Sequence, residues 1–104
     1  IALHKDELAG ESSLFYWKSP QAEEVDFVVK QGLHITKLIQ VCADISNPQT
    51  LKREMRGLIK ASEVLRCRDL LLLNDREDRT ESFTWQGVTR QIRFVPLWQW
   101  LIER

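Results

Sequence analysis

Three polar residues in two apolar stretches have the spacing that metal-assisted hydrolysis requires. Asp26 interrupts an apolar run at residues 25–29, and Gln40 and Cys42 stand two positions apart in a second run at residues 38–43. Side chains two positions apart on a strand point to the same face. A carboxylate on one strand and oxygen ligands on its neighbour can hold Mg²⁺ beside a phosphate. The spacing indicates the layout of a metal-dependent nuclease site, with part of its chemistry replaced.

Gln40 and Cys42 occupy the positions where such a site needs an acid and a lysine. A glutamine offers a carbonyl oxygen without negative charge, and a cysteine is neutral or negative, so it cannot act as an ammonium group. We expect core packing at both positions in preference to catalysis; if the site is active, Asp26 and Gln40 are the expected metal ligands. A carboxylate in an apolar strand is costly unless paired or ligated. This cost favours the remnant of a ligand site at Asp26 over a solvent-facing side chain or an ion pair with Lys30.

Further charged residues are candidates for the same chemistry. Glu7, Glu11 or Glu24 could supply a second carboxylate near Asp26, but a charged surface helix is the preferred account of Glu7, Glu11 and His4. A helix is predicted over residues 2–9, with Gly10 as its end. A row of basic residues on a later helix could contact phosphates, although interleaved glutamates favour a solvated face. The row consists of Lys52, Arg53, Arg56 and Lys60, and the glutamates are Glu54 and Glu63.

Composition limits the classes of function. The 104 residues are 43% hydrophobic and 29% charged, which is typical of one soluble domain with its own core. Fifteen basic and fifteen acidic residues give a net charge of zero, which excludes a broad positive field toward nucleic acid or membrane but leaves a local patch open. No apolar run approaches the length of a membrane span, so we expect no membrane partner.

The two cysteines are expected to be buried, reduced thiols. Cys42 and Cys67 are far apart in the sequence, and each lies beside apolar, strand-like residues. A zinc site that combines them with His4 and His34 is not favoured, because no two of these residues have the close spacing of a ligand pair.

The apolar patterns predict a mixed α/β fold. Residues 14–17, 25–30 and 35–42 are predicted strands, with a turn at Gln31-Gly32. Strict alternation would place Val25, Phe27 and Val29 on one face of the second strand. Four consecutive leucines at residues 70–73 indicate a buried strand parallel to the third, reached by a right-handed crossover. Residues 82–86 and 91–95 form a predicted strand pair around Gly87.

Two helices complete the predicted sheet and lie on its two sides. Asn47 as cap and Pro48 at the first position predict the start of an amphipathic helix that runs to Leu65. A short helix is expected to follow Pro96. Its tryptophans at positions 98 and 100 cannot both face the core, so one of them either marks an interface with another domain or is partly buried on the domain's own sheet.

The chain resembles the C-terminal domain of a family of bacterial and archaeal AAA-type ATPases, the domain of unknown function 4143. The similarity lies in residues 14–18 and 24–29, continues through residues 38–46 and 50–61, and ends in residues 92–101. It covers nearly the whole chain, and residues 24–27 and 95–101 are its most specific parts.

The resemblance implies a restriction-endonuclease-like fold of the PD-(D/E)XK type, an ATPase module preceding it, and a cytoplasmic location. The chain begins at Ile1 and has no P-loop pattern, so we expect residues 1–104 to be one nuclease-like domain from the C-terminal part of a longer protein, with ATP bound elsewhere. Family members often have Glu-Val-Lys in the third strand, where this chain has Gln40-Val41-Cys42.

Three functions remain open from the sequence. The first is an accessory binding or regulatory domain without catalysis or a cofactor of its own, whose partner is the ATPase module of the same parent. The second is a Mg²⁺-dependent DNA nuclease with a relocated basic residue. The third is a docking or oligomerisation module that uses the tryptophan-bearing end. A nucleic-acid partner and an oligomeric assembly are both compatible with the sequence.

Overall fold

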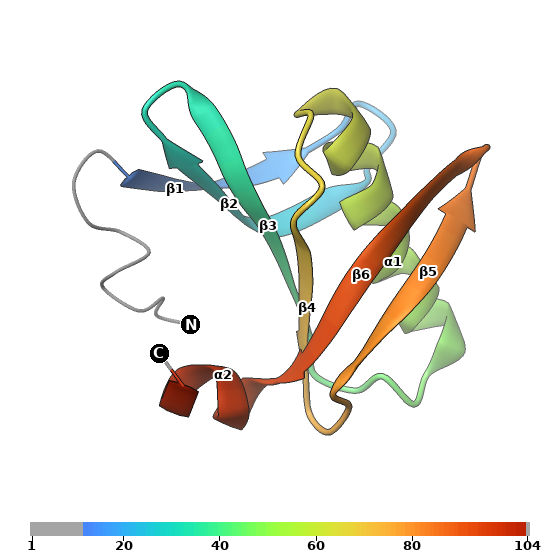
Figure 1. The fold of residues 1–104 in the computed structure, drawn as a ribbon. Coiled ribbons are helices and arrows are strands. Elements are labelled where there is room, and N and C mark those ends of the chain that lie inside the picture. Colours follow the sequence, from blue (N-terminus) through green and yellow to red (C-terminus); the bar gives the residue numbers. More distant parts are fainter. Residues whose placement is uncertain (1–11, 104) are drawn as a thin grey trace.

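The computed structural model describes residues 12–103, which form one mixed sheet with a helix on each face (Figure 1). The strands are β1 (Ser12–Lys18), β2 (Glu24–Gln31), β3 (His34–Cys42), β4 (Leu70–Asn74), β5 (Arg79–Trp85) and β6 (Val88–Pro96), and the helices are α1 (Pro48–Val64) and α2 (Leu97–Glu103). The six strands lie in the order β1-β2-β3-β4-β6-β5. The predicted mixed α/β sheet is confirmed, and the predicted helix over residues 2–9 lies outside the described residues.

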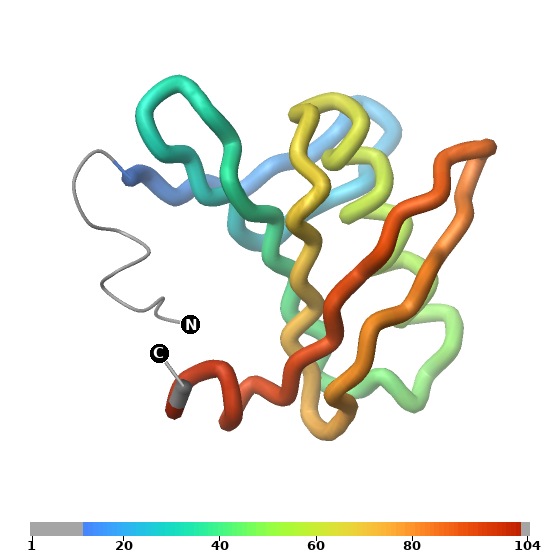
Figure 2. Tube along the Cα trace, in the orientation of Figure 1, coloured from blue at the N-terminus to red at the C-terminus, as the bar shows by residue number. Residues whose placement is uncertain are grey.

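The sheet combines an antiparallel meander with a parallel centre. β1, β2 and β3 pair antiparallel, β4 is parallel to both β3 and β6, and β5 pairs antiparallel with β6 at the far edge. Figure 2 shows the chain passing from the end of β3 through α1 to the start of β4. The predicted parallel pairing of β3 with the leucine strand is therefore confirmed.

Two apolar cores lie on opposite faces of the sheet. The α1-side core contains buried residues of β2, β3, β4, β6 and α1, and the α2-side core contains Val29, Ile39, Leu71, Leu73, Val95 and Trp100. Because β4 contributes to both cores, its leucine run is buried on both faces, as expected for a central parallel strand.

The predicted face of Val25 is wrong, because a β-bulge interrupts the alternation of β2. Trp17 of β1 pairs with Val25 and Phe15 pairs with Val28, so one residue of β1 lies opposite both Asp26 and Phe27. Because β2 has one more residue than β1 at this point, the side chain of Val25 lies in the α1-side core with Val28. Phe27 packs against the α2-side core.

α1 begins and ends at capping motifs. The Asn47 side chain accepts hydrogen bonds from the backbone N–H groups of Gln49 (3.1 Å) and Thr50 (3.2 Å), which confirms the predicted start. At the other end the N–H of Cys67 donates to the Ser62 carbonyl (3.1 Å), as in a Schellman motif. The residue between the helix cap and Cys67 is Arg66, which has a left-handed φ of 56° where glycine is usual.

Replacing Arg66 with glycine is expected to stabilise the fold, because glycine adopts a left-handed backbone without a Cβ clash. The free energy of unfolding, measured by urea denaturation, should rise by about 1 kcal/mol. Arg53→Gly, an exposed position in the interior of α1, is the matched control and should lower it by about the same amount. Destabilisation by both substitutions would contradict the strain at Arg66.

Candidate functional site

Asp26 lies where β2 and β3 cease to pair as regular strands. Their pairing ends at Phe27 and Ile39, and beyond that point two side chains bridge the strands. The N–H of Asp26 donates to Oε1 of Gln40 (2.8 Å), and the N–H of Val41 donates to Oδ2 of Asp26 (2.9 Å). Each side chain accepts a hydrogen bond from a backbone N–H of the opposite strand. Asp26 and Gln40 therefore lie close together, and both hold β2 and β3 in place.

The Gln40 carboxamide connects three elements of the fold. Its side chain is buried, with an exposed fraction of 1%, and Nε2 donates to the carbonyls of Glu24 (2.7 Å) and Glu54 (3.0 Å). Together with the bond from Asp26, these contacts use one acceptor and both donors of the group. Gln40 therefore joins the start of β2 and the first half of α1 to β3.

Gly57 allows α1 to approach this bridge. It was not among the candidate residues predicted from the sequence. A Cβ at Gly57 would lie 2.1 Å from the Glu24 carbonyl oxygen and 2.9 Å from Nε2 of Gln40. No larger residue fits without a shift of the helix. The available signal was a glycine in the interior of an otherwise regular helix pattern.

Three carboxylates interact around the bridge. Glu24 and Asp26 come from β2, and Glu54 comes from α1. Burial and then the charge of Asp26 raise the pKa of the Glu54 carboxyl, with a smaller contribution from Glu24. The hydroxyl of Tyr16 donates to Glu24, and chiefly this hydrogen bond raises the pKa of Tyr16 to about 12. Within residues 12–103 no three Asp, Glu, His or Cys side chains form a group that could hold a metal ion.

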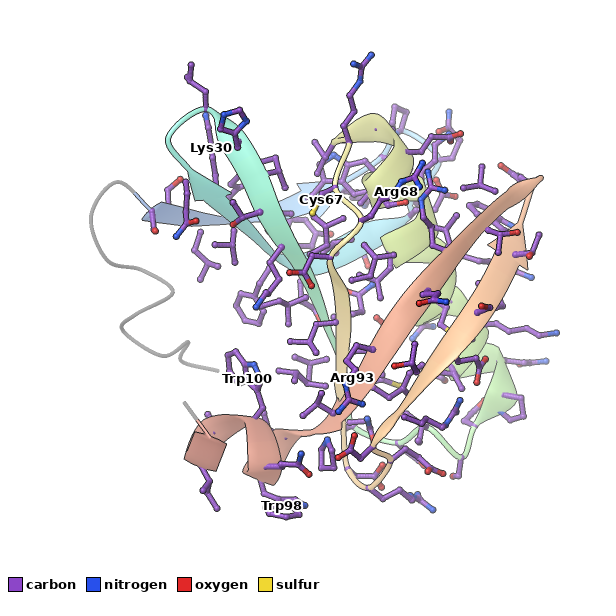
Figure 3. All side chains as sticks on the ribbon, viewed as in Figure 1. Lys30, Cys67, Arg68, Arg93, Trp98 and Trp100 are labelled. Atoms are coloured by element: carbon purple, nitrogen blue, oxygen red, sulfur yellow. The ribbon has the colours of Figure 1, made fainter. Side chains whose placement is uncertain are left out.

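Cys42 lies on the same side of β3 as Gln40, in the α1-side core. Burial and then the charge of Glu54 raise the pKa of its thiol, so the group is neutral at ordinary pH. A neutral thiol does not supply the positive charge of a lysine. Lys30 does not supply it either: it lies beside the β2–β3 hairpin (Figure 3), four residues from Asp26 and thus about 13 Å along the strand.

The residues considered for zinc are dispersed. Cys42 and Cys67 are both buried and free, as predicted. Cys42 pairs with Asn74 at the end of β4, whereas Cys67 precedes the start of that strand, so the two thiols lie toward opposite ends of the sheet. His34 is exposed beside the β2–β3 hairpin. His4, Glu7 and Glu11 lie outside the described residues.

The two tryptophans of α2 face in different directions, as predicted. Trp100 is buried in the α2-side core with an exposed fraction of 3%, whereas Trp98 is 61% exposed. Figure 3 shows Trp98 pointing away from the sheet and Trp100 toward it. Leu101 and Ile102 are 50% and 75% exposed, so α2 presents an exposed apolar surface made of Trp98, Leu101 and Ile102. None of the described helices has the length and apolar character needed to cross a membrane.

The raised pKa of Glu54 predicts a pH-dependent effect of its removal. The folded state holds the Glu54 proton more tightly than the unfolded chain does. Ionisation of Glu54 therefore lowers the free energy of unfolding at pH values above the folded pKa. It has no such effect well below the unfolded pKa of about 4.3, where the carboxyl is protonated in both states. Glu54→Gln should therefore raise the free energy of unfolding at about pH 7 and change it little at about pH 3. Glu63→Gln, an exposed glutamate of the same helix, is the control. An equal gain at both pH values would exclude carboxylate repulsion as the cause.

The chain was compared with protein-family models, with curated proteins and with solved structures, and none of them matches.

Proposed function

We propose that this chain is an accessory binding domain of an AAA-type ATPase, with a restriction-endonuclease-like fold and no catalysis of its own. The observation that carries this proposal is the use made of the three candidate site positions. Oδ2 of Asp26 and the carboxamide of Gln40 make the hydrogen bonds of the β2–β3–α1 bridge, and Cys42 is a buried neutral thiol. In this arrangement the carboxamide is directed at the protein backbone, and Lys30 lies about 13 Å along the strand from Asp26.

The sheet topology is compatible with the fold that the resemblance implies. An antiparallel meander, a crossover helix and a parallel strand follow one another in the expected order. The partner that we propose is the ATPase module of the same parent chain, which would bind the ATP and work in the cytoplasm.

A Mg²⁺-dependent nuclease is the competing function, and it would require the hydrogen bonds of the bridge to change. A cation held by Oδ2 of Asp26 and Oε1 of Gln40 must share these oxygens with the backbone N–H groups that now donate to them, or displace those N–H groups. Glu24 and Glu54 could add negative charge around such a cation. The two functions therefore differ in whether the hydrogen bonds between β2 and β3 change when a divalent ion is added.

A titration of the chain with Mg²⁺ and Mn²⁺, followed by NMR, separates these functions. The amide signals of Asp26, Gln40 and Val41 should not show saturable changes, because their groups remain engaged with each other. Asp26→Asn is the matched variant, since it removes the charge and keeps an oxygen for the Val41 N–H. Saturable changes that are lost in this variant, together with ion-dependent cleavage of plasmid DNA, would establish the nuclease.

The surface of α2 is the contact that we propose for the ATPase module. Trp98, Leu101 and Ile102 are at least half exposed. Exposed apolar groups that lie together are typical of interaction sites, and aromatic residues are enriched at the centres of protein interfaces. This surface favours a docking role, which was the third function left open by the sequence.

The docking contact predicts a selective effect of a charge on α2. Ile102→Glu should weaken binding of the separately expressed ATPase module roughly tenfold or more, measured by calorimetry, because a carboxylate is costly in an apolar interface. Leu33→Glu is the matched control: Leu33 is 91% exposed in the β2–β3 turn, away from α2 (Figure 1). Equal weakening by both variants, or no effect of Ile102→Glu, would exclude α2 as the contact.

A further inference from the structure

The arginines of this chain divide into two groups by their partners. Eight arginines lie between residues 12 and 103, and most of them interact with an acid or an aromatic ring. Those with ion pairs are Arg53, Arg76, Arg79 and Arg93, and Arg56 lies over the ring of Trp85. Within the described residues, Arg66, Arg68 and Arg90 make no ion pair. These three line one region of the surface, which we call the arginine notch.

The notch arises from the unequal lengths of two neighbouring strands. β6 begins at Val88 and pairs with β5 from that residue, but its pairing with β4 begins only at Arg93. The segment between α1 and β4 passes this unpaired part of β6 and carries Arg66 and Arg68. Figure 3 shows Arg68 beside the end of α1.

Two hollows meet at the notch. One has a volume of about 370 Å³ and is lined by Arg68, Arg90, Ser82, Thr89 and Gln91. The other has a volume of about 400 Å³, shares Arg68 and Arg90, and adds Ser62, Glu63 and Arg66. Among residues 12–103, Glu63 is the one carboxylate in these two linings. The other groups that line the hollows with Arg68 and Arg90 are hydroxyls, one amide and the guanidinium group of Arg66.

Arg90 is held in place by the fold. Its Nε donates to Oγ of Ser62 (3.2 Å) and its Nη1 donates to the carbonyl of Thr89 (3.0 Å). Ser62 is itself buried and donates to the Ile59 carbonyl (2.7 Å), so the contact is anchored in α1. Because the side chain is already ordered, binding a ligand costs less conformational entropy than it would at a mobile arginine. Nη2 of Arg90 makes no hydrogen bond within the described residues.

Arg66 retains its side chain at a position where glycine would relieve strain. Its left-handed backbone places the residue at the rim of the second hollow. Backbone strain in a non-glycine residue is often associated with function. The cationic side chain is thus present in the notch despite a cost to the fold.

We propose that the arginine notch binds the phosphate groups of single-stranded nucleic acid. Guanidinium groups match phosphate oxygens in a bidentate geometry. Two hollows joined by the same pair of arginines can accept consecutive phosphates of one strand, whereas a single small anion needs only one. The concave shape of the two hollows is poorly suited to a flat anionic bilayer. The notch adjoins the end of α1, whereas the Asp26 bridge contacts its first half, so this site does not depend on the proposed accessory function.

Binding of a labelled, mixed-sequence single-stranded oligonucleotide at low salt, followed by fluorescence anisotropy, tests the notch. Arg68→Gln should weaken the affinity about tenfold, since it removes a charge-assisted contact. Arg53→Gln is the matched control, because it removes the same charge from an exposed site on the first half of α1 and should change the affinity less than about twofold. Arg66→Gly should also weaken binding while the protein remains folded.

Several results would overturn the proposal. One is the absence of oligonucleotide binding at low salt. Another is equal weakening by Arg53→Gln and Arg68→Gln, which would indicate general surface charge. Inorganic phosphate that binds as tightly as the oligonucleotide would assign the notch to a small anion instead. Binding to phosphatidylglycerol vesicles without oligonucleotide binding would assign it to a membrane.

Discussion

The hydrogen bonds of the Gln40 carboxamide are the interactions on which the arrangement of this domain depends. A buried amide must satisfy its polar atoms within the protein, because unsatisfied groups cost about 1–3 kcal/mol each. Gln40 does so through the backbones of Glu24, Asp26 and Glu54, and thereby fixes the distance between α1 and the sheet. Gly57 is the complementary constraint, since the Glu24 carbonyl occupies the space that a side chain would need.

This constraint also gives Asp26 and Gln40 a role in the fold itself. The bulge in β2 ends the regular pairing, and the Asp26 carboxylate and the Gln40 amide then supply the hydrogen bonds that the two backbones no longer exchange. Selection for a stable fold would retain both residues whether or not a metal binds. The exposed apolar surface of α2 and the arginine notch at the end of α1 both lie away from this bridge.

The sequence predicted those features that depend on local spacing. The cap at Asn47, the amphipathic pattern of α1 and the leucine run of β4 each follow from interactions within a few residues, and the structure agrees with all three. The face of Val25 was predicted incorrectly, because the bulge at Asp26 and Phe27 is created by pairing with β1 rather than by the β2 sequence. The lengths of β5 and β6 were likewise underestimated. The ends of both strands contain polar residues, which do not show a strand pattern, but backbone pairing between the two strands includes them.

The sequence by itself determined which residues could do chemistry and on which strands they lie. Only the tertiary structure decided what these residues contact. The amide of Gln40 is directed at two carbonyls that are 14 and 16 positions away in the chain. Arg68 and Arg90 line the same two hollows because β4 starts later than its neighbour β6. Hydrogen-bond partners and shared cavities of this kind depend on how distant segments pack, and the spacing of residues along one segment does not contain that information.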